Sequence, residues 1–173
     1  MEKKIAIVTG GSSGIGRATA AALARAGCLV YEFSRREIPQ EGVKHLSVDV
    51  TREEAVQAAV NQILSQQGRI DTVVNCAGFG ISGAVEFTEP EAAKSQFDVN
   101  FFGCVTVNRA VLPILRRQGG GRILLISSVA ASAHIPFQAY YSASKAALES
   151  YACALANEVR PFGIAVPAVA LGD

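Results

Sequence analysis

The chain has 173 residues, half of them apolar, and a formal net charge of +1 at pH 7. This length fits one domain with a substantial core, and the balanced charge excludes the broad basic surface of a nucleic-acid-binding protein. Four scattered cysteines and two histidines favour neither a zinc site nor a disulfide framework, and no apolar run reaches the roughly 18 residues of a membrane span. We therefore expect a cytoplasmic protein with no metal site, no membrane span and no nucleic-acid partner.

Short β-type runs and longer alanine-rich runs alternate through the first half of the chain. Helices are predicted at 14–27 and 52–67. Thr51 is expected to cap the second helix, and Glu53 and Glu54 lie in its first turn, where the helix dipole favours acidic residues. The runs that are rich in apolar and β-branched residues predict strands at 4–9, 29–34, 43–49 and 70–75.

The second half of the chain continues this alternation. A helical stretch runs from 90 to 117, and we expect it to bend near Pro113, because proline breaks the helical hydrogen-bond ladder. The remaining predicted elements are a strand at 122–127, a helix at 140–160 and a strand at 164–171.

This order of elements predicts the α/β class. Strands that are apolar throughout and alternate with helices form a parallel sheet covered by helices on both faces. Because the sequence holds no repeat or linker, residues 1–173 are interpreted as one doubly wound Rossmann domain. The chain stops two residues after the sixth predicted strand, which leaves that strand as a sheet edge.

The stretch "TGGSSGIG" at 9–16 joins the first predicted strand to the first helix. Glycines at such a turn permit positive φ and let a phosphate approach the free amides of the helix. A tight turn without a ligand explains glycine doublets equally well. The spacing from Gly11 to Gly16 fits a P-loop, but Arg17 and Ala18 follow in place of the lysine and hydroxyl residue, which disfavours phosphotransfer. The GxGxxG dinucleotide pattern also fails, because Thr19 stands where its last glycine would be.

Two tyrosines stand side by side near the start of the helix predicted at 140–160. Side chains four residues apart share one face of a helix. Tyr140 therefore shares a face with Ser144, whereas Tyr141 shares one with Lys145. A neighbouring ammonium group and a helix N-terminus both favour a phenolate, which makes Tyr141 the better acid–base candidate. Taken alone, the YxxxK spacing is a weak signal.

The glycine turn in fact reads TGxxxGxG, from Thr9 to Gly16, and "NCAG" at 75–78 follows the fourth predicted strand. These motifs, in this order, resemble those of the short-chain dehydrogenase/reductase family. The usual family form of the second motif is NNAG, and Cys76 replaces its second asparagine. The resemblance extends from Lys4 to Gly172 and implies a Rossmann fold that binds a nicotinamide dinucleotide.

The end of the second strand, "YEFSRR", bears on the choice of cofactor. In the family, an aspartate that selects NAD would fall at Ser34, and an arginine directly after it is the NADP-type arrangement, because it pairs with the 2′-phosphate. Ser34 and Arg35 are therefore expected to prefer NADP(H) over NAD(H), with Arg36 as a helper. Glu32 argues against this preference if its side chain emerges near the ribose.

The resemblance also assigns the remaining cofactor contacts. Asp49 and Val50 match the family's contact to adenine, although Asp49 also suits a place beside the cap of the following helix. The full set of residues expected to bind the cofactor is Gly10, Ser12, Ser13, Gly14, Ile15, Gly16, Ser34, Arg35, Asp49, Val50, Asn75, Ala77, Gly78, Tyr141 and Lys145.

The family's catalytic tetrad maps onto Asn100, Ser128, Tyr141 and Lys145. Ser128 lies thirteen residues before Tyr141, an offset that favours it over Ser127, and it is expected to orient the substrate oxygen. Tyr141 is expected to exchange the proton while hydride passes between the nicotinamide and a carbonyl or alcohol carbon. Lys145 is expected to bind the nicotinamide ribose and support the phenolate, and Asn100 to link Lys145 to solvent through a water molecule.

Further expectations concern substrate and assembly. Two stretches, "GFGISGAVEF" and "DVNFFG", are similar to the branch that contains hydroxysteroid and retinoid reductases. The small-molecule substrate is expected to be apolar, and the family's usual assembly is a homodimer or homotetramer. Residues expected to line an apolar pocket are Phe79, Ile81, His134, Ile135 and Phe137.

The end of the chain qualifies these expectations. In the family a "PG" follows the sixth strand, but here the sequence reads "VALGD", with Leu171 in place of the proline. The family's substrate loop and last strand have no counterpart in the chain, so we expect it to be truncated. A second interpretation is therefore a sensor or scaffold that binds NADP without turnover, although the intact tetrad counts against it.

Overall fold

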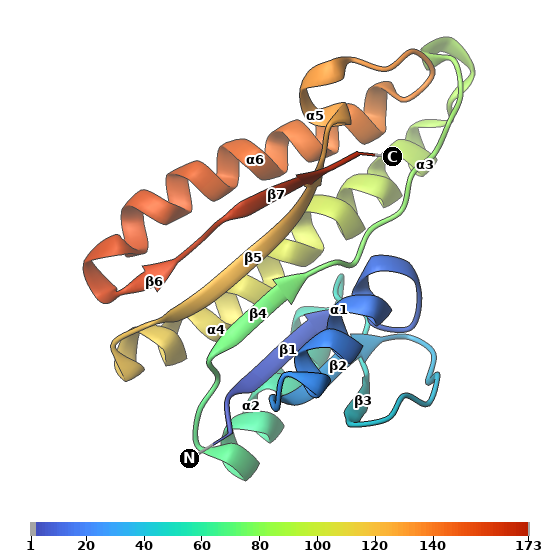
Figure 1. The fold of residues 1–173 in the computed structure, drawn as a ribbon. Helices are drawn as coiled ribbons and strands as arrows, with labels where there is room; N and C mark the ends of the chain where they lie inside the picture. Colours follow the sequence, from blue (N-terminus) through green and yellow to red (C-terminus); the bar gives the residue numbers. More distant parts are fainter. Residues whose placement is uncertain (1–2, 173) are drawn as a thin grey trace.

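A computed structural model describes residues 3–172 of the chain. Its centre is a parallel β-sheet with the strand order β3-β2-β1-β4-β5-β6, and β7 also pairs with β5 (Figure 1). This confirms the doubly wound Rossmann fold predicted from the sequence. The strands are β1 (Ile5–Thr9), β2 (Leu29–Ser34), β3 (Val43–Ser47), β4 (Thr72–Asn75), β5 (Gly121–Ser128), β6 (Ile164–Ala165) and β7 (Ala168–Leu171).

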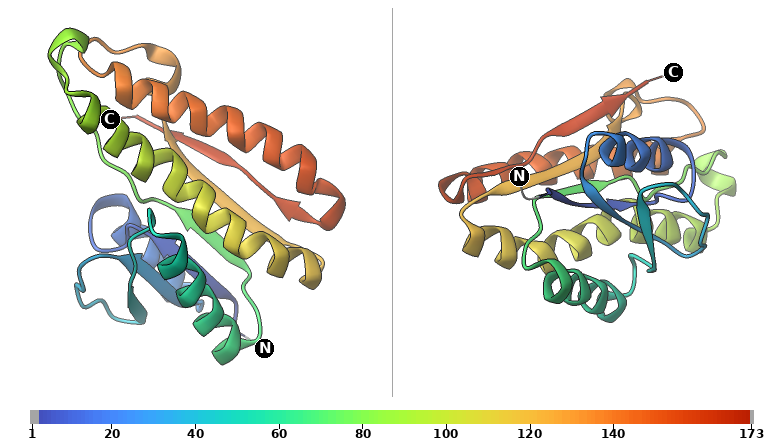
Figure 2. Two further views of the ribbon diagram at one scale, coloured as in Figure 1. Left: turned by 180° about the vertical axis from the view of Figure 1, so that it is seen from behind. Right: turned by 60° about the horizontal axis from the view of Figure 1, so that its bottom comes forward.

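Helices cover both faces of this sheet. Figure 2 shows α2, α4 and α6 together on one face and α1 on the other. The larger apolar core lies on the side of α2, α4 and α6, and a smaller cluster of Ala6, Val8, Ala20, Val30 and Val74 lies beneath α1. No helix within residues 3–172 combines the length and apolar character needed to cross a bilayer. The helices are α1 (Gly14–Arg25), α2 (Glu53–Gln67), α3 (Pro90–Phe97), α4 (Cys104–Gln118), α5 (Ala130–Ala133) and α6 (Ala139–Val159), with short turns η1 (Val85–Phe87), η2 (Asp98–Gly103) and η3 (Arg160–Phe162).

The register of the sheet brings three sequence motifs to one edge. Thr9 at the end of β1 is opposite Phe33 of β2 and Asn75 of β4. The glycine turn, the "SRR" segment and "NCAG" therefore leave the sheet side by side. The strand order reverses direction between β1 and β4, and ligands of open α/β sheets bind at such a switch point.

Two helix predictions need correction. The stretch 90–117 departs from α-helical geometry at η2, a π-helical turn, while α4 continues through Pro113. The departure from α-helical geometry thus lies at η2, directly before α4, whereas the expectation was a bend near Pro113. Thr51 does not cap α2, which begins at Glu53, because the Thr51 hydroxyl donates to Asp49 Oδ1 at 2.7 Å.

The predicted sixth strand, 164–171, is also interrupted. It forms two short strands, β6 and β7, separated by Val166 and Pro167. Pro167 has no amide to donate to a ladder, although its carbonyl still accepts a hydrogen bond from the Leu125 amide at 3.0 Å. Both short strands pair with β5.

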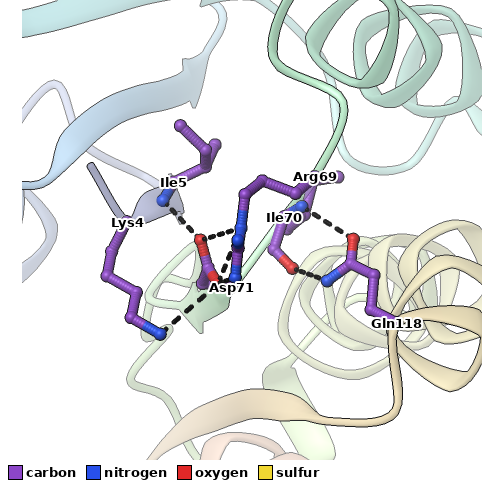
Figure 3. A network of polar contacts seen from close by, with 6 residues as sticks. All are labelled: Lys4, Ile5, Arg69, Ile70, Asp71 and Gln118. Atoms are coloured by element: carbon purple, nitrogen blue, oxygen red, sulfur yellow. Dashed lines mark hydrogen bonds and ion pairs between the residues drawn. The ribbon is translucent and has the colours of Figure 1, made fainter. Parts of the chain in front are cut away.

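A polar network fastens the opposite end of the sheet (Figure 3). Asp71, just before β4, accepts the Ile5 amide at 2.8 Å and pairs with Arg69 at 2.6 Å. Gln118 at the end of α4 accepts a hydrogen bond from the Ile70 amide and donates one to the Ile70 carbonyl. Burial alone would raise the pKa of Asp71, but the hydrogen bonds from Arg69 and Ile5 and the Arg69 charge hold it below its ordinary value. This network joins the starts of β1 and β4 to the end of α4.

Candidate active site

A cavity of about 680 Å³ lies at the carboxyl edge of the sheet. The glycine turn forms one side of it, and the segments that follow β2, β3 and β4 form the rest. Its volume falls in the range of small-molecule and cofactor pockets. The predicted cofactor residues that line it are Gly10, Ser12, Ser13, Gly14, Ile15, Gly16, Ser34, Arg35, Asp49, Val50, Ala77 and Gly78.

The glycine turn is packed too tightly for side chains at Gly10, Gly11 and Gly16. A Cβ on Gly16 would lie 2.3 Å from the Gly10 carbonyl oxygen, and Gly10 has a φ of +68°. A Cβ on Gly10 would lie 2.9 Å from the Ala77 Cα. The turn thus brings the start of α1 directly against the cavity, where helix amides suit a phosphate group. Ser13 at the N-cap makes no side-chain cap hydrogen bond within the described residues. The residues of the glycine turn therefore fit the phosphates of a dinucleotide.

Thr9 holds the two sides of the switch point together. Its Oγ1 accepts the amides of Cys76 and Ala77, each at 3.0 Å. The sequence marked Thr9 as part of the turn motif but gave no sign of this linking role. Asn75, in contrast, turns its side chain away from the cavity and donates to Asn108 Oδ1 at 2.9 Å in the core.

The end of β2 presents Ser34, Arg35 and Arg36 to the cavity. Glu32 does not line it; this residue is 2% exposed and binds His45 beneath the glycine turn. Hydrogen bonds from the Thr51 hydroxyl and amide lower the pKa of Asp49, and the nearby Arg35 charge lowers it further. An anionic carboxylate and the arginine side chains thus flank the same part of the cavity.

Tyr141 and Lys145 lie on one side of α6, as their spacing predicts. Lys145 Nζ is 5.8 Å from the centre of the Tyr141 ring. The Lys145 side chain is almost fully buried, and its Nζ donates to the Ile126 carbonyl at 2.7 Å. Burial lowers the pKa of Lys145 below its ordinary value.

Asn100 connects this pair to the edge of the cavity. Its Nδ2 donates to the Phe79 carbonyl at 2.9 Å and to Ser144 Oγ at 3.1 Å, while its Oδ1 accepts the Phe79 amide. A Cβ on Gly78 would lie 3.1 Å from Asn100 Oδ1 and 3.8 Å from Lys145 Nζ. Gly78 is therefore the point where the cavity meets the candidate catalytic cluster. The sequence did not indicate that Ser144 belongs to this network.

The two serines at the end of β5 have different surroundings. Ser127 is buried, and its hydroxyl donates to Glu149 Oε1 at 2.7 Å. Ser128 is partly exposed, and its Oγ accepts the Ala130 amide at 3.2 Å. Within residues 3–172 the Ser128 hydroxyl proton has no acceptor.

Exposed apolar groups adjoin Tyr141. A Cβ on Gly80 would lie 3.6 Å from the Tyr141 ring. The Gly83 amide donates to the Phe137 carbonyl at 2.8 Å, which ties the loop after β4 to the loop before α6. Of the five residues expected around an apolar substrate, Phe79 lines the cavity, whereas Phe137 is 66% exposed. Phe79 and Phe137 are thus exposed apolar side chains on the two loops that this hydrogen bond joins.

A nucleotide-type cavity at the switch point and a Tyr-Lys pair beside it define a class of Rossmann oxidoreductase. The sequence matches the profile described as short chain dehydrogenase over residues 4–173. The chain belongs to the short-chain dehydrogenase family.

Individual relatives give further comparison. The chain is 47% identical over 174 residues to a 3-ketodihydrosphingosine reductase of Bacteroides thetaiotaomicron, which covers all of this chain and 65% of the relative. A short-chain dehydrogenase from Streptomyces avermitilis superposes with a TM-score of 0.95 at 36% identity, covering 100% of this chain and 66% of that one. A Brucella melitensis 3-ketoacyl-(acyl-carrier-protein) reductase complexed with NADH gives 0.93 at 31% identity, covering 98% and 75%. The chain thus spans about two thirds of the length of its relatives.

Proposed function

We propose that the protein is an NADP(H)-dependent oxidoreductase that interconverts a ketone and a secondary alcohol. The observation that carries this proposal is the placement of Tyr141 and Lys145, 5.8 Å from ring centre to Nζ, next to a cavity built from the glycine turn. Gly78 lies between this pair and the cavity, and a Cβ on it would be 3.8 Å from Lys145 Nζ. A phenol and an ammonium group at the end of a dinucleotide cavity are suited to proton exchange with a substrate oxygen.

A bound nicotinamide supplies or accepts hydride at the substrate carbon. In the reducing direction Tyr141 donates its phenolic proton to the carbonyl oxygen. The Lys145 ammonium stabilises the phenolate that remains, because an opposite charge favours the ionised form. Ser128 donates a hydrogen bond to the same oxygen and so orients it. Asn100 positions the cluster by holding the Phe79 backbone against Ser144 of α6.

The preference for NADP(H) is proposed from the end of β2. Arg35 and Arg36 line the cavity beside Ser34, and guanidinium groups pair well with a phosphate. Glu32, the one carboxylate of β2, is buried under the glycine turn and so does not reach a ribose hydroxyl in the cavity. This arrangement supports the proposed preference for NADP(H).

The apolar surface around Phe79 and Phe137 supports a hydrophobic ketone as substrate. The Bacteroides relative is named for a ketone carried on a long-chain lipid. We therefore propose a long-chain keto lipid as the substrate class of the whole protein.

This proposal is tested by following NADPH absorbance with a panel of long-chain 3-keto lipids, short ketones and aldehydes. Oxidation of NADPH that is faster with the long-chain ketones is the expected result. Tight NADPH binding without oxidation by any member of the panel would instead indicate a cofactor-binding protein without turnover.

A further inference from the structure

Glu32 and His45 form a buried polar pair on the α1 side of the sheet. They lie directly opposite each other in the parallel register of β2 and β3. His45 Nδ1 is in hydrogen-bond contact with Glu32 Oε1, and Ser34 Oγ donates to the same oxygen at 3.2 Å. Glu32 is 2% exposed, and its Oε2 is buried without a hydrogen-bond partner among residues 3–172.

The glycine turn covers this carboxylate from above. A Cβ on Gly11 would lie 2.6 Å from the Glu32 Cβ and 2.9 Å from Oε2. Glu32 is therefore held between the turn and β3, directly beneath the segment that begins the cavity wall. Burying a carboxylate here raises the free energy of the folded state unless neighbouring groups donate hydrogen bonds to it. The donors near Glu32 are His45 and Ser34.

Ser34 is the donor that also faces the cavity. A hydroxyl has one proton and two acceptor lone pairs. The single proton of Ser34 has two acceptors within reach, Glu32 Oε1 at 3.2 Å on the buried side and the exposed Arg36 carbonyl at 2.9 Å. Ser34 thus offers the cavity an acceptor. A ribose hydroxyl can donate to that acceptor, whereas a phosphate requires a donor.

We propose that Glu32 is a specificity-determining residue that acts through Ser34 to weaken the preference for NADP(H) over NAD(H). His45 counteracts this effect. Its hydrogen bond to Glu32 Oε1 makes that oxygen a weaker acceptor for the Ser34 proton. The inference rests on the proposed function in one respect: the 2′ position of the nucleotide faces Ser34, Arg35 and Arg36.

The test is calorimetric titration of the 173-residue chain with NADPH and with NADH. Glu32→Gln replaces the carboxylate by a weaker acceptor and should raise the ratio of NADPH to NADH affinity about 3- to 10-fold. His45→Leu removes the competing donor and should lower the ratio. Glu37→Gln changes an exposed carboxylate of the adjoining loop and should leave the ratio within about twofold, as expected for a solvent-screened charge.

A double-mutant cycle separates the Ser34 route from a general charge effect. In a Ser34→Ala background, Glu32→Gln should leave the ratio unchanged, because the proton that Glu32 directs is absent. An equal rise in both backgrounds, or no rise in folded Glu32→Gln protein, would overturn the proposal. If Glu32→Gln fails to fold, His45→Leu decides: a fall in the ratio supports the proposal and an unchanged ratio refutes it.

A separate variant tests the proposed function. Arg35→Ala should lower NADPH affinity more than NADH affinity, because the guanidinium would contact only the 2′-phosphate. An equal effect on both cofactors would show that the NADP(H) assignment is at fault, and this outcome is distinct from any result at Glu32.

Discussion

Tyr140 and Tyr141 are neighbours in the sequence and yet have different environments. The ring of Tyr141 lies near Lys145 Nζ and against Gly80, at the end of the cavity. Tyr140, one residue earlier, is turned by about 100° around the helix axis, and its side chain is partly exposed. Tyr141 is also partly exposed, so it is the nearby Lys145 that marks it as the candidate acid–base group.

The cysteines provide a test of burial at the residue scale. Burial raises the pKa of Cys104 to about 12 and that of Cys76 to about 11, whereas Cys153 is exposed. At pH 8 only about one Cys104 thiol in ten thousand would be ionised, and the thiolate is the reactive form. We predict that an aromatic disulfide reagent labels Cys153 first and Cys104 only on unfolding.

The control for this labelling is Cys153→Ser, which should remove the fast phase and leave the slow phases unchanged. Labelling of Cys104 in the folded protein at the rate of Cys153, identified by peptide mass, would contradict the burial described here.

At the scale of elements, a polar bridge links β4, α4 and α6 within the core. Asn108 of α4 accepts a hydrogen bond from Asn75 at 2.9 Å and donates to the Tyr151 hydroxyl at 3.3 Å. Burial raises the pKa of Tyr151 to about 12, so the phenol stays neutral. This bridge orients α6, the helix that presents Tyr141 and Lys145.

Removing the centre of this bridge should destabilise the fold. Asn108→Ala removes the hydrogen-bond partner of the buried Asn75 amide and of the half-buried Tyr151 hydroxyl, and we predict a loss of about 1–3 kcal/mol in the free energy of unfolding. Asn61→Ala, at an exposed position of α2, should change it by less than about 0.5 kcal/mol. Chemical denaturation measures both, and equal losses would mean that Asn108 does not bridge the elements.

The network around Asp71 should give stability a defined pH dependence. Because its pKa is lower in the folded protein than when unfolded, Asp71 stabilises the fold above its ordinary pKa, and this contribution is lost as pH falls through the lowered value. We predict that Asp71→Asn costs about 1–3 kcal/mol at pH 7 and progressively less in acid.

Denaturant unfolding from pH 7 down to pH 3 measures this difference, with the exposed Glu41→Gln as control. A deficit in Asp71→Asn that stays constant over the whole range would show that the carboxylate charge is not what stabilises this end of the sheet.

The sequence predicted the alternation of strands and helices well, because each buried strand is a continuous apolar run bounded by turn residues. It did not predict the π-helical turn at η2, because the weak helix formers of "DVNFFG" lower helix propensity without specifying which kind of turn forms. It also missed the partnership of Glu32 and His45, because thirteen residues separate them and only the register of β2 and β3 brings them together. Tertiary pairings of this kind determine which predicted site residues face the cavity and which, like Asn75, face the core.

At the scale of the whole molecule, one end of the sheet carries a polar network and the other end carries the candidate site. The Asp71 network closes one end, and the cavity with Tyr141 and Lys145 lies at the other. The Asp71 network is thus separated from the side chains proposed to act on a ligand. Substitutions at Asp71 should therefore change stability without changing the relative affinities for NADPH and NADH.

The proposed chemistry depends on one proton held at one hydroxyl. Tyr141→Phe removes that proton and keeps the aromatic ring, and Tyr140→Phe is its matched control on the same helix turn. Neither change alters the residues that line the cavity, so both variants should bind NADPH as the unchanged chain does.

The most direct measurement is the rate of NADPH oxidation by a long-chain 3-keto lipid in these two variants at saturating cofactor. We predict that Tyr141→Phe loses about 10²- to 10⁴-fold in rate, while Tyr140→Phe retains most of the activity. Equal losses in both variants, or undiminished turnover in Tyr141→Phe, would contradict the assignment of Tyr141 as the acid–base group.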